Sequence, residues 1–321
     1  MKQKVLICGL GSVGKRHFKN LLNLGFEDII LLRRENSHQE VLDRNFPTFS
    51  SLLEALQQQP TVSIICTPTH MHIDAAIECA NSGSHVFIEK PISNSLRRVD
   101  ELKSICSKKN LVCMVGYMMR YHPLIIKMKE LISEDKIGNL IYLKTHWGEY
   151  LPDTHPWEDY RKSYAARKEM GGGPALSLSH DLDLILWIVG SKVKSSSRLD
   201  SYRSSLELNC EHASDFLIEF DNGVTSHAHL DFFQKPAKRI IEVIGEKGSL
   251  EFNYYKNKLE YKGHVPDDKK IYYEEKFDRN QLFISEMIDF FQSVEKNLCS
   301  SINIDGSLEL LNLIGGKNNE F

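Results

Sequence analysis

The sequence contains no long hydrophobic run and almost no net charge, and each absence excludes a class of protein. No apolar stretch approaches the roughly 18 residues of a membrane-spanning helix, and Met1–Lys4 leads directly into an apolar run. We therefore expect no signal peptide and no membrane partner. The net charge is −3, from 40 basic and 43 acidic residues, so the composition does not favour a nucleic acid as a partner.

The cysteines lack the spacing of a disulfide or zinc framework. Seven are present, an odd number, and none lies in a CxxC motif. The seven are Cys8, Cys66, Cys79, Cys106, Cys113, Cys210 and Cys299, and most of them fall in predicted strands and helices. We interpret them as reduced residues, mostly of the core, in a cytoplasmic protein.

Two HxH pairs suggest a metal site but do not complete one. They are His70 with His72 and His227 with His229. Both imidazoles of such a pair can bind one ion when the pair lies on a strand, but no further ligand follows at a recognisable spacing. We therefore predict no metal.

A glycine-rich turn follows the first predicted strand. The apolar run 5–8 ends in Gly9-Leu10-Gly11-Ser12-Val13-Gly14, which is a GxGxxG pattern at the start of an amphipathic segment. Gly9 permits the tight turn, Gly11 lets the backbone approach a pyrophosphate, and Gly14 allows close packing of helix on strand. Free N–H groups at the start of the helix, around Ser12 and Val13, would bind the anion. The pattern predicts a dinucleotide site, and the alternative is a glycine-rich turn in another α/β protein.

Two arginines follow the second predicted strand, Asp28–Leu32. NAD-specific sites usually carry Asp or Glu there to bind the ribose 2′-hydroxyl, whereas this chain has Arg33 and Arg34. A guanidinium can instead pair with a 2′-phosphate and stack on adenine. NADP is therefore the favoured cofactor, and the adjacent Glu35 keeps NAD as an alternative.

Strands and helices alternate through the first third of the chain. Strands are expected at 62–66, 85–88 and 112–115, with helices between them at about 73–82 and 96–108. This pattern predicts a doubly wound parallel sheet, whose ligands bind outside the carboxyl ends of the strands. Those ends carry Gly9-Leu10-Gly11, Arg33-Arg34, Thr67-Pro68-Thr69, Glu89-Lys90-Pro91 and Gly116-Tyr117.

The pattern changes after a predicted helix at 124–131. Strand-like segments at 140–147, 214–220, 224–230, 239–244 and 249–254 are joined partly by hairpin turns. We predict two domains, residues 1–118 as a Rossmann domain and residues 119–321 as an α+β domain with a large, mostly antiparallel open sheet. Ser195-Ser196-Ser197 is expected to form a loop.

The chain resembles the glucose-fructose oxidoreductase, inositol dehydrogenase and MocA family over nearly its whole length. The motifs that carry the resemblance occur in the family's order: GLGSVGKRH, TPTHMH, EKP, VGYMMRYHP, GGGPALSLSHDLDLILWIVG and IGEKGSLEF. The resemblance implies NAD(P)-dependent oxidation or reduction of secondary alcohols in sugars and polyols. Residues 150–173, followed by SHDLD, are similar to a subgroup associated with bacterial surface-glycan sugars.

The resemblance also implies residue roles. Lys90 would contact the reacting hydroxyl and His180 would be its acid/base partner. A lysine beside a cationic nicotinamide can exchange a proton near neutrality, because desolvation and like charge favour its neutral form, and histidine titrates there unaided. The cofactor would be bound by Gly9, Gly11, Ser12, Val13, Gly14, Arg33, Arg34, Thr67, Pro68, His72, Glu89 and Lys90.

Arginines and aromatic residues interleave in the predicted substrate region, where they could bind an acidic group and stack on a sugar face or a base. The candidates are Arg120, Tyr121, His122, Trp157, Tyr160, Arg161, Tyr164, Arg167, Ser177 and Asp183. The alternative is a solvated, charged loop anchored by Trp157. Ser177 and Met118 stand where many relatives have Asp and Asn. Asp183, three residues after His180, would share its helix face and orient it.

Together these features predict an enzyme that interconverts a secondary alcohol and a ketone on an acidic or nucleotide-linked sugar derivative. The alternatives are a catalytically silent dinucleotide-binding sensor and a glycosidase that recycles NAD. We also expect a homodimer or homotetramer, formed through an apolar row of Phe216, Ile218 and Phe220 on the exposed face of the second sheet.

Overall fold

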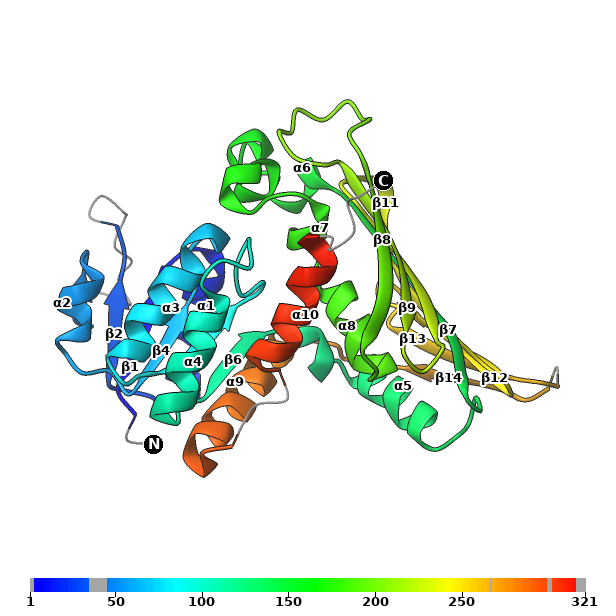
Figure 1. Ribbon diagram of the computed structural model, residues 1–321, viewed down its shortest axis with the longest axis horizontal. Coiled ribbons are helices and arrows are strands. Elements are labelled where there is room, and N and C mark those ends of the chain that lie inside the picture. The colour runs from blue at the N-terminus through cyan, green and yellow to red at the C-terminus, as the bar shows by residue number, and fades with distance from the viewer. Residues whose placement is uncertain (1–2, 35–44, 266, 299–301, 316–321) are drawn as a thin grey trace. The chain divides into compact units, whose positions relative to one another are not determined.

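The computed structural model describes residues 3–34, 45–265, 267–298 and 302–315. The chain divides into two units (Figure 1). Unit 1 comprises Met1–Tyr117 and Phe283–Leu308, and unit 2 comprises Met118–Leu282 and Glu309–Phe321. This division differs from the predicted domain boundaries in one main respect, because residues 283–308 belong to unit 1.

Unit 1 contains a six-stranded sheet in the order β3-β2-β1-β4-β5-β6, and all of its pairings are parallel. The strands are β1 (Val5–Cys8), β2 (Ile29–Leu32), β3 (Thr48–Phe49), β4 (Val62–Ile65), β5 (His85–Glu89) and β6 (Cys113–Gly116). The helices are α1 (Ser12–Asn23), α2 (Leu52–Leu56), η1 (Thr69–Met71), α3 (His72–Asn81), α4 (Val99–Lys109) and most of α9 (Arg279–Lys296). The central strands are buried apolar runs, as expected where helices cover both faces. The predicted doubly wound sheet is confirmed.

Unit 2 contains an eight-stranded sheet in the order β14-β13-β12-β11-β7-β10-β9-β8. The strands are β7 (Leu140–Tyr150), β8 (Val193–Ser201), β9 (Ala213–Phe220), β10 (Thr225–Asp231), β11 (Phe233–Gly245), β12 (Gly248–Asn253), β13 (Lys258–Gly263) and β14 (Lys269–Tyr273). β7 and β10 are parallel, and the other pairs in this order are antiparallel. The predicted open, mostly antiparallel sheet is confirmed.

The helices of unit 2 lie between these strands in sequence. They are η2 (Met118–Tyr121), α5 (Pro123–Ser133), α6 (Leu151–Thr154), η3 (Tyr160–Lys162), η4 (Tyr164–Ala166), η5 (Lys168–Met170), α7 (Pro174–Ser177) and α8 (His180–Val189). A last helix, α10 (Ile304–Gly315), continues from the end of unit 1 into unit 2. Figure 1 shows α5 and α8 on the same side of the long sheet.

Two expectations about this sheet are wrong. Phe216, Ile218 and Phe220 are buried within the chain itself, and the neighbouring Leu217 is 61% exposed. The apolar row therefore forms the core of unit 2 and is not available to a second subunit. The Ser195–Ser197 segment is not a loop but lies in β8, where pairing with β9 outweighs the weak strand preference of serine.

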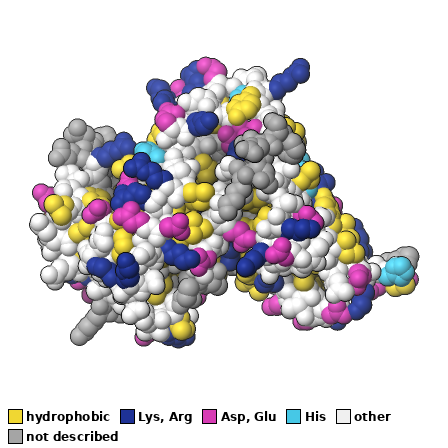
Figure 2. All heavy atoms as spheres, in the orientation of Figure 1, with side chains coloured by type: hydrophobic (Ala, Val, Ile, Leu, Met, Phe, Trp, Pro, Cys, Tyr) yellow, Lys and Arg dark blue, Asp and Glu magenta, His cyan; other side chains and the backbone are white. Residues whose placement is uncertain are grey.

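The remaining sequence expectations concern charge, cysteines and membranes. Basic and acidic side chains are intermixed on the face drawn in Figure 2. The six cysteines within the described ranges form no disulfide, and five of them are buried; Cys299 lies outside those ranges. No helix in the described part of the chain is long and apolar enough to cross a membrane.

Candidate functional site

The glycine-rich turn of unit 1 lies between β1 and α1, and its three glycines meet different surroundings. Gly9 has φ +97°, and a Cβ there would lie 2.8 Å from the Cys66 carbonyl oxygen. A Cβ on Gly14 would lie 1.9 Å from the Gly9 carbonyl oxygen. A Cβ on Gly11, by contrast, would have no heavy atom within 4 Å. Gly9 and Gly14 are thus required by packing, whereas Gly11 borders open space.

That open space adjoins the first turn of α1. Gly11 is the N-cap, Ser12 and Val13 begin the helix, and the first turn holds no acidic side chain. Backbone N–H groups at such a helix start attract phosphate. The site fits the pyrophosphate of a dinucleotide, since bare backbone and free volume occur together here.

The carboxyl ends of neighbouring strands meet at one edge of the unit 1 sheet. Cys8 pairs with Ile65, and Ile65 pairs with Ile88. The residues that follow these strands therefore lie along the same edge: the glycine turn after β1, the Thr67-Pro68 segment after β4 and Lys90 after β5. Lys90 is half-buried. Arg33 and Arg34 lie at the end of β2, half-buried and exposed respectively.

His72 connects two of these loops. Its Nδ1 lies 2.8 Å from the Pro91 carbonyl oxygen and its Nε2 lies 2.6 Å from the Thr67 carbonyl oxygen. Carbonyl oxygens only accept, so both contacts are hydrogen bonds together only when the ring is protonated. Burial lowers the pKa of His72, which favours the neutral ring and one donated bond at a time. Either way the ring fixes the segment after Lys90 against the β4 loop. The sequence predicted His72 as a cofactor contact. In the structure both of its ring nitrogens lie against backbone carbonyl oxygens.

Glu89 is the residue before Lys90, and its carboxylate faces the interior of unit 1. Its Oε1 lies 2.6 Å from His17 Nε2 on α1. Burial alone would raise the pKa of Glu89, but the hydrogen bond and charge of His17 lower it. The ligand atoms of Glu286, on α9, lie within 4.8 Å of this pair. Burial and the charge of Glu89 raise the pKa of Glu286 well above its ordinary value. Glu89 thus joins the loop after β5 to the core.

His180 is the first residue of α8 in unit 2. It is buried, and its ring is stacked with the ring of Trp147 on β7, with the two ring centroids 6.2 Å apart. Ser177, at the end of α7, is also buried, and Tyr121 in η2 is half-buried. These positions place His180 and Ser177 at the junction between two short helices.

Two buried ion pairs hold the first turn of α8. Asp183 accepts hydrogen bonds from Arg120 Nε at 2.9 Å and Nη2 at 2.6 Å. Asp181 accepts from Arg239 on β11, whose guanidinium lies 3.8 Å from the Trp147 ring centroid. Burial raises the pKa of both carboxyls, while the arginine beside each opposes the rise. The pairs anchor the helix that carries His180.

These pairs bear on two predictions. Arg120 was proposed to bind substrate and Asp183 to orient His180, and the structure pairs Arg120 and Asp183 with each other. The Asp181–Arg239 pair and Trp147 were not predicted. Arg239 is separated from Asp181 by 58 residues, and the only local signal was the additional acidic residue beside His180.

Most of the predicted substrate residues lie in the segment 149–190, called the insertion below. Its arginines at 161 and 167 are paired with acidic side chains of the same unit. Arg161 bonds Asp159 through Nε at 2.8 Å, and its Nη1 lies 3.4 Å from a Glu207 oxygen. Arg167 Nη1 lies 3.6 Å from Glu169. Nearby, the hydroxyl of Tyr160 accepts the Glu207 N–H.

The aromatic residues and glycines of the insertion differ in exposure. Trp157 is 75% exposed and Tyr164 is 42% exposed. A Cβ on Gly172 would lie 2.5 Å from the Tyr164 carbonyl oxygen, and one on Gly173, at φ +97°, would lie 2.3 Å from Glu211 Oε1. The glycines therefore let the insertion pack closely before α7, while the rings of Trp157 and Tyr164 remain accessible to a ligand.

Comparison with known proteins identifies the family. Residues 3–117 match the oxidoreductase family with an NAD-binding Rossmann fold, GFO_IDH_MocA, and residues 125–251 match the GFO/IDH/MocA C-terminal domain. The chain belongs to this family. The resemblance inferred from the motifs is confirmed.

Individual relatives are distant. An uncharacterized oxidoreductase of Streptococcus pneumoniae is 26% identical over 57% of the chain and 49% of its own length. The scyllo-inositol 2-dehydrogenase (NAD(+)) of Bacillus subtilis is 27% identical over 76% of the chain and 72% of its own length. A levoglucosan dehydrogenase solved in complex with NADH superposes with a TM-score of 0.84 at 19% identity, covering 96% of this chain and 93% of that one. This last likeness shows the shared fold.

Proposed function

We propose that the protein is an NAD(P)-dependent oxidoreductase that interconverts a secondary alcohol and a ketone on a sugar derivative. The observation that carries the proposal is the shared edge of the unit 1 sheet. There the open space at Gly11, the Thr67-Pro68 segment and Lys90 follow three adjacent strands. Ligands of doubly wound sheets bind at such an edge, and the family match supports a nicotinamide dinucleotide as the ligand.

Each residue of the proposed site has a separate task. Gly11, Ser12 and Val13 bind the pyrophosphate through backbone N–H groups. A bound nicotinamide supplies hydride transfer. Lys90 contacts the reacting oxygen and moves its proton, and His72 and Glu89 hold the loop that carries Lys90. In unit 2, His180 exchanges a proton as the acid/base partner, and its helix is held by Asp181 and Asp183.

The finer assignments rest on fewer observations. Arg33 and Arg34, at the end of β2, support NADP over NAD, because they can pair with a 2′-phosphate. The exposed rings of Trp157 and Tyr164 beside basic residues support an acidic or nucleotide-linked sugar, in surface-glycan metabolism by resemblance. A homodimer or homotetramer remains part of the proposal, without Phe216, Ile218 and Phe220 as its interface.

The decisive experiment replaces Lys90 with methionine, which keeps the length of the side chain and removes the amine. We expect turnover to fall by about 10²- to 10⁴-fold, the usual loss for a proton-transfer group. Dinucleotide affinity should stay nearly unchanged, because the pyrophosphate contacts lie elsewhere. Turnover is followed by absorbance of the reduced cofactor with scyllo-inositol, levoglucosan and UDP-linked hexuronic acids as probes. Affinity is followed by parallel fluorescence titrations with NADH and NADPH.

The matched control is Lys108→Met, an exposed lysine near the end of α4, which should leave both measurements unchanged. Wild-type turnover in Lys90→Met would refute the role of Lys90. Dinucleotide binding with no turnover on any probe would favour the alternative hypothesis of a catalytically silent sensor. Release of a sugar from a glycoside without net change in the cofactor would favour the glycosidase reading.

A further inference from the structure

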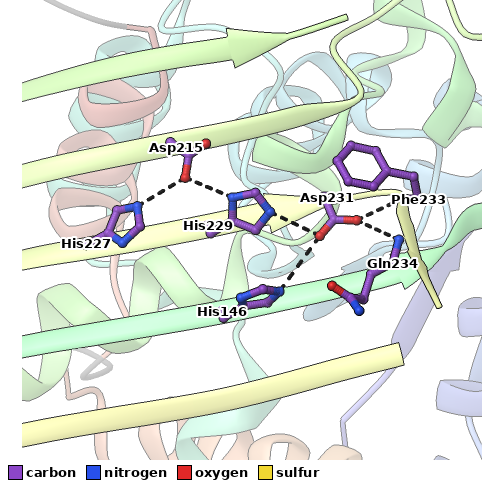
Figure 3. Close-up of polar contacts among 7 residues, drawn as sticks. All are labelled: His146, Asp215, His227, His229, Asp231, Phe233 and Gln234. Atoms are coloured by element: carbon purple, nitrogen blue, oxygen red, sulfur yellow. Dashed lines mark hydrogen bonds and ion pairs between the residues drawn. The ribbon is translucent and has the colours of Figure 1, made fainter. Parts of the chain in front are cut away.

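A cluster of histidines and carboxylates lies on the half-exposed face of the unit 2 sheet, and the proposed reaction does not use it (Figure 3). Cross-strand pairing brings His146 on β7 opposite His229 on β10, and His229 opposite Asp215 on β9. Asp231 follows His229 by two residues, so its side chain extends from the same face. Three adjacent strands therefore contribute to one cluster.

The donor atoms of three of these residues converge. His229 Nε2 lies 3.2 Å from Asp231 Oδ2, and His146 Nε2 lies 4.0 Å from the same oxygen. All three atoms lie within 4.8 Å of one another. Ligands bound to one zinc ion at about 2.0–2.2 Å lie somewhat closer together than this, so small side-chain rotations would bring all three into coordination.

Two of the three side chains are held in orientation by other groups. Asp231 is fully buried, and its Oδ1 accepts the backbone N–H groups of Phe233 at 2.9 Å and Gln234 at 2.7 Å. Its Oδ2 is therefore directed at the histidines. A Cβ on Gly148, the cross-strand neighbour of Asp231, would lie 2.2 Å from Oδ2. The strand thus has a glycine where the carboxylate needs room.

His229 is oriented through its second nitrogen. Its Nδ1 lies 2.8 Å from Asp215 Oδ1. A histidine that binds a metal almost always donates its other ring N–H to a carboxylate or carbonyl, which fixes the tautomer and strengthens the ligand. Asp215 is correctly placed for this role toward Nε2 as the ligand atom.

We propose that His146, His229 and Asp231 form a binding site for a divalent transition-metal ion, Zn²⁺ by ligand type, with Asp215 orienting His229. Two imidazoles and one carboxylate suit zinc, which binds three protein ligands and leaves a fourth position for water in open sites. The side chains of His146 and His229 are partly exposed, whereas Asp231 is buried. The HxH pair of His227 and His229 did not predict this site from the sequence. The second histidine ligand, His146, lies on a strand that is distant in sequence.

A proton on His229 is the main competing occupant. The hydrogen bond to Asp231 raises the pKa of His229 against the effect of burial, and Asp215 raises it further. The protonated ring of His229 would donate one hydrogen bond to Asp215 and one to Asp231, and it would make no contact that involves His146 Nε2. Within the described ranges, His146 Nε2 is buried and has no partner at hydrogen-bonding geometry, although the side chain of Gln234 lies near enough to His146 to oppose the lowering of its pKa by burial. A buried polar atom without a partner of good geometry is a position where a water or an ion is expected. A metal would engage all three side chains.

The charges around the cluster favour a divalent cation, except for one nearby lysine. Asp231 and Asp215 together carry two negative charges, which balance the ion when the histidines are neutral. His227 contacts Asp215 at 3.1 Å but does not reach the other donors as a ligand. Lys238 is the cation that weakens the site.

The test uses the full chain without a histidine tag, stripped of metal by a chelator that is then removed. Zn²⁺ is titrated in competition with a chromophoric chelator. We expect one tight site per chain, and affinity that rises with pH, since the His229 proton must be released. His146→Ala and His229→Ala should each weaken binding at least tenfold, and Asp215→Asn should weaken it by about 10- to 100-fold.

The control variant is His227→Ala, which removes the neighbouring histidine on the same face and should keep wild-type affinity. Thermal unfolding of each variant in chelator checks that it remains folded. In excess Zn²⁺ the melting temperature of the wild type and of His227→Ala should rise, whereas that of His146→Ala should not. The visible spectrum of the Co²⁺ form should show four-coordinate geometry in the wild type and lose it in His146→Ala.

Three results would overturn the proposal. One is the absence of a stoichiometric site in the wild type, which would leave a proton as the occupant. Another is equal affinity in the wild type and in His146→Ala, which would place the ion elsewhere. The third is an equal loss in His227→Ala, which would indicate loose binding by surface histidines. None of these measurements depends on the dinucleotide or on turnover, so the proposal stands or fails apart from the proposed reaction.

Discussion

At the scale of single residues, glycines in one turn serve different purposes, and this separates folding from binding. A methyl group on Gly14 would collide with the backbone oxygen of Gly9, which cannot move without shifting the turn. A methyl group on Gly11 would meet nothing in the protein, and its φ of −69° suits alanine. The same chemical change should therefore have opposite effects at the two positions.

We predict that Gly14→Ala lowers the free energy of unfolding by about 1–3 kcal/mol, as overpacking does. Gly11→Ala should leave it within about 0.5 kcal/mol of wild type. The methyl group would occupy the approach path of the pyrophosphate, so Gly11→Ala should weaken NADH binding about tenfold or more. Chemical denaturation without ligand and fluorescence titration measure the two effects. Unchanged NADH affinity in Gly11→Ala would place the cofactor elsewhere.

The sequence could predict which residues lie at the strand ends, because the signals for those positions are local. Gly9, Gly11 and Lys90 each follow an apolar run, and a parallel sheet aligns such positions at one edge. The pairing of Arg120 with Asp183 could not be predicted in the same way. The two residues are separated by 63 positions, and an arginine near a predicted substrate loop is equally compatible with an anion site or an internal ion pair.

At the scale of secondary structure, α9 brings an acidic residue into the core of unit 1. Glu286 is fully buried, and within the described ranges neither carboxylate oxygen has a hydrogen-bond partner. Burial and the nearby charge of Glu89 raise its pKa well above the ordinary value. The folded protein therefore binds the Glu286 proton more tightly than the unfolded chain does.

The pH dependence follows from this difference. The contribution of Glu286 to stability is fully present below its unfolded pKa of about 4.3 and is lost as the pH rises through its higher folded pKa. Glutamine has nearly the same shape and no proton to lose. Glu286→Gln should therefore gain stability over wild type as the pH rises, by about 1.4 kcal/mol for each pH unit in that window.

Chemical denaturation at a series of pH values, from acidic to neutral, measures the effect. Glu295→Gln, at an exposed position of the same helix, is the control and should follow the wild-type curve at a constant offset. If Glu286→Gln also follows the wild type at a constant offset, the folded state holds Glu286 ionised.

Elements with a clear period were predictable, and those that depend on their neighbours were not. The apolar strands of unit 1 and the alternating strands near β9 and β10 follow the expected patterns. β8 has a serine-rich sequence and is a strand because β9 pairs with it along its length. The short helices of the insertion have no apolar period, and Gly172 and Gly173 show why the local backbone is irregular there.

At the scale of the whole chain, unit 1 is assembled from two segments that are far apart in sequence. Phe291 on α9 packs against Phe26 with ring centroids 4.3 Å apart, and Phe290 packs against Phe87 at 5.5 Å. Met287, which lies one helical turn before these two residues on α9, is fully buried. Local patterns cannot reveal such a return, because α9 is an ordinary amphipathic helix whose apolar face could cover either unit.

We predict that residues 1–117 alone do not fold cooperatively, whereas residues 1–117 joined through a flexible Gly-Ser linker to residues 283–308 do. Burying each large apolar side chain stabilises a protein by about 1.5–3 kcal/mol. Removing Met287, Phe290 and Phe291 together therefore costs about as much as the roughly 5–15 kcal/mol by which a domain is stable. The short chain should lack a cooperative thermal transition and near-ultraviolet circular dichroism, and the joined chain should show both and bind NADH.

A control with Met287, Phe290 and Phe291 all changed to serine in the joined chain should behave like the short one. Equal cooperativity of the short and joined chains would mean that the parallel sheet and the helices of residues 1–117 form a sufficient core, and that α9 is attached to unit 1 without supporting it.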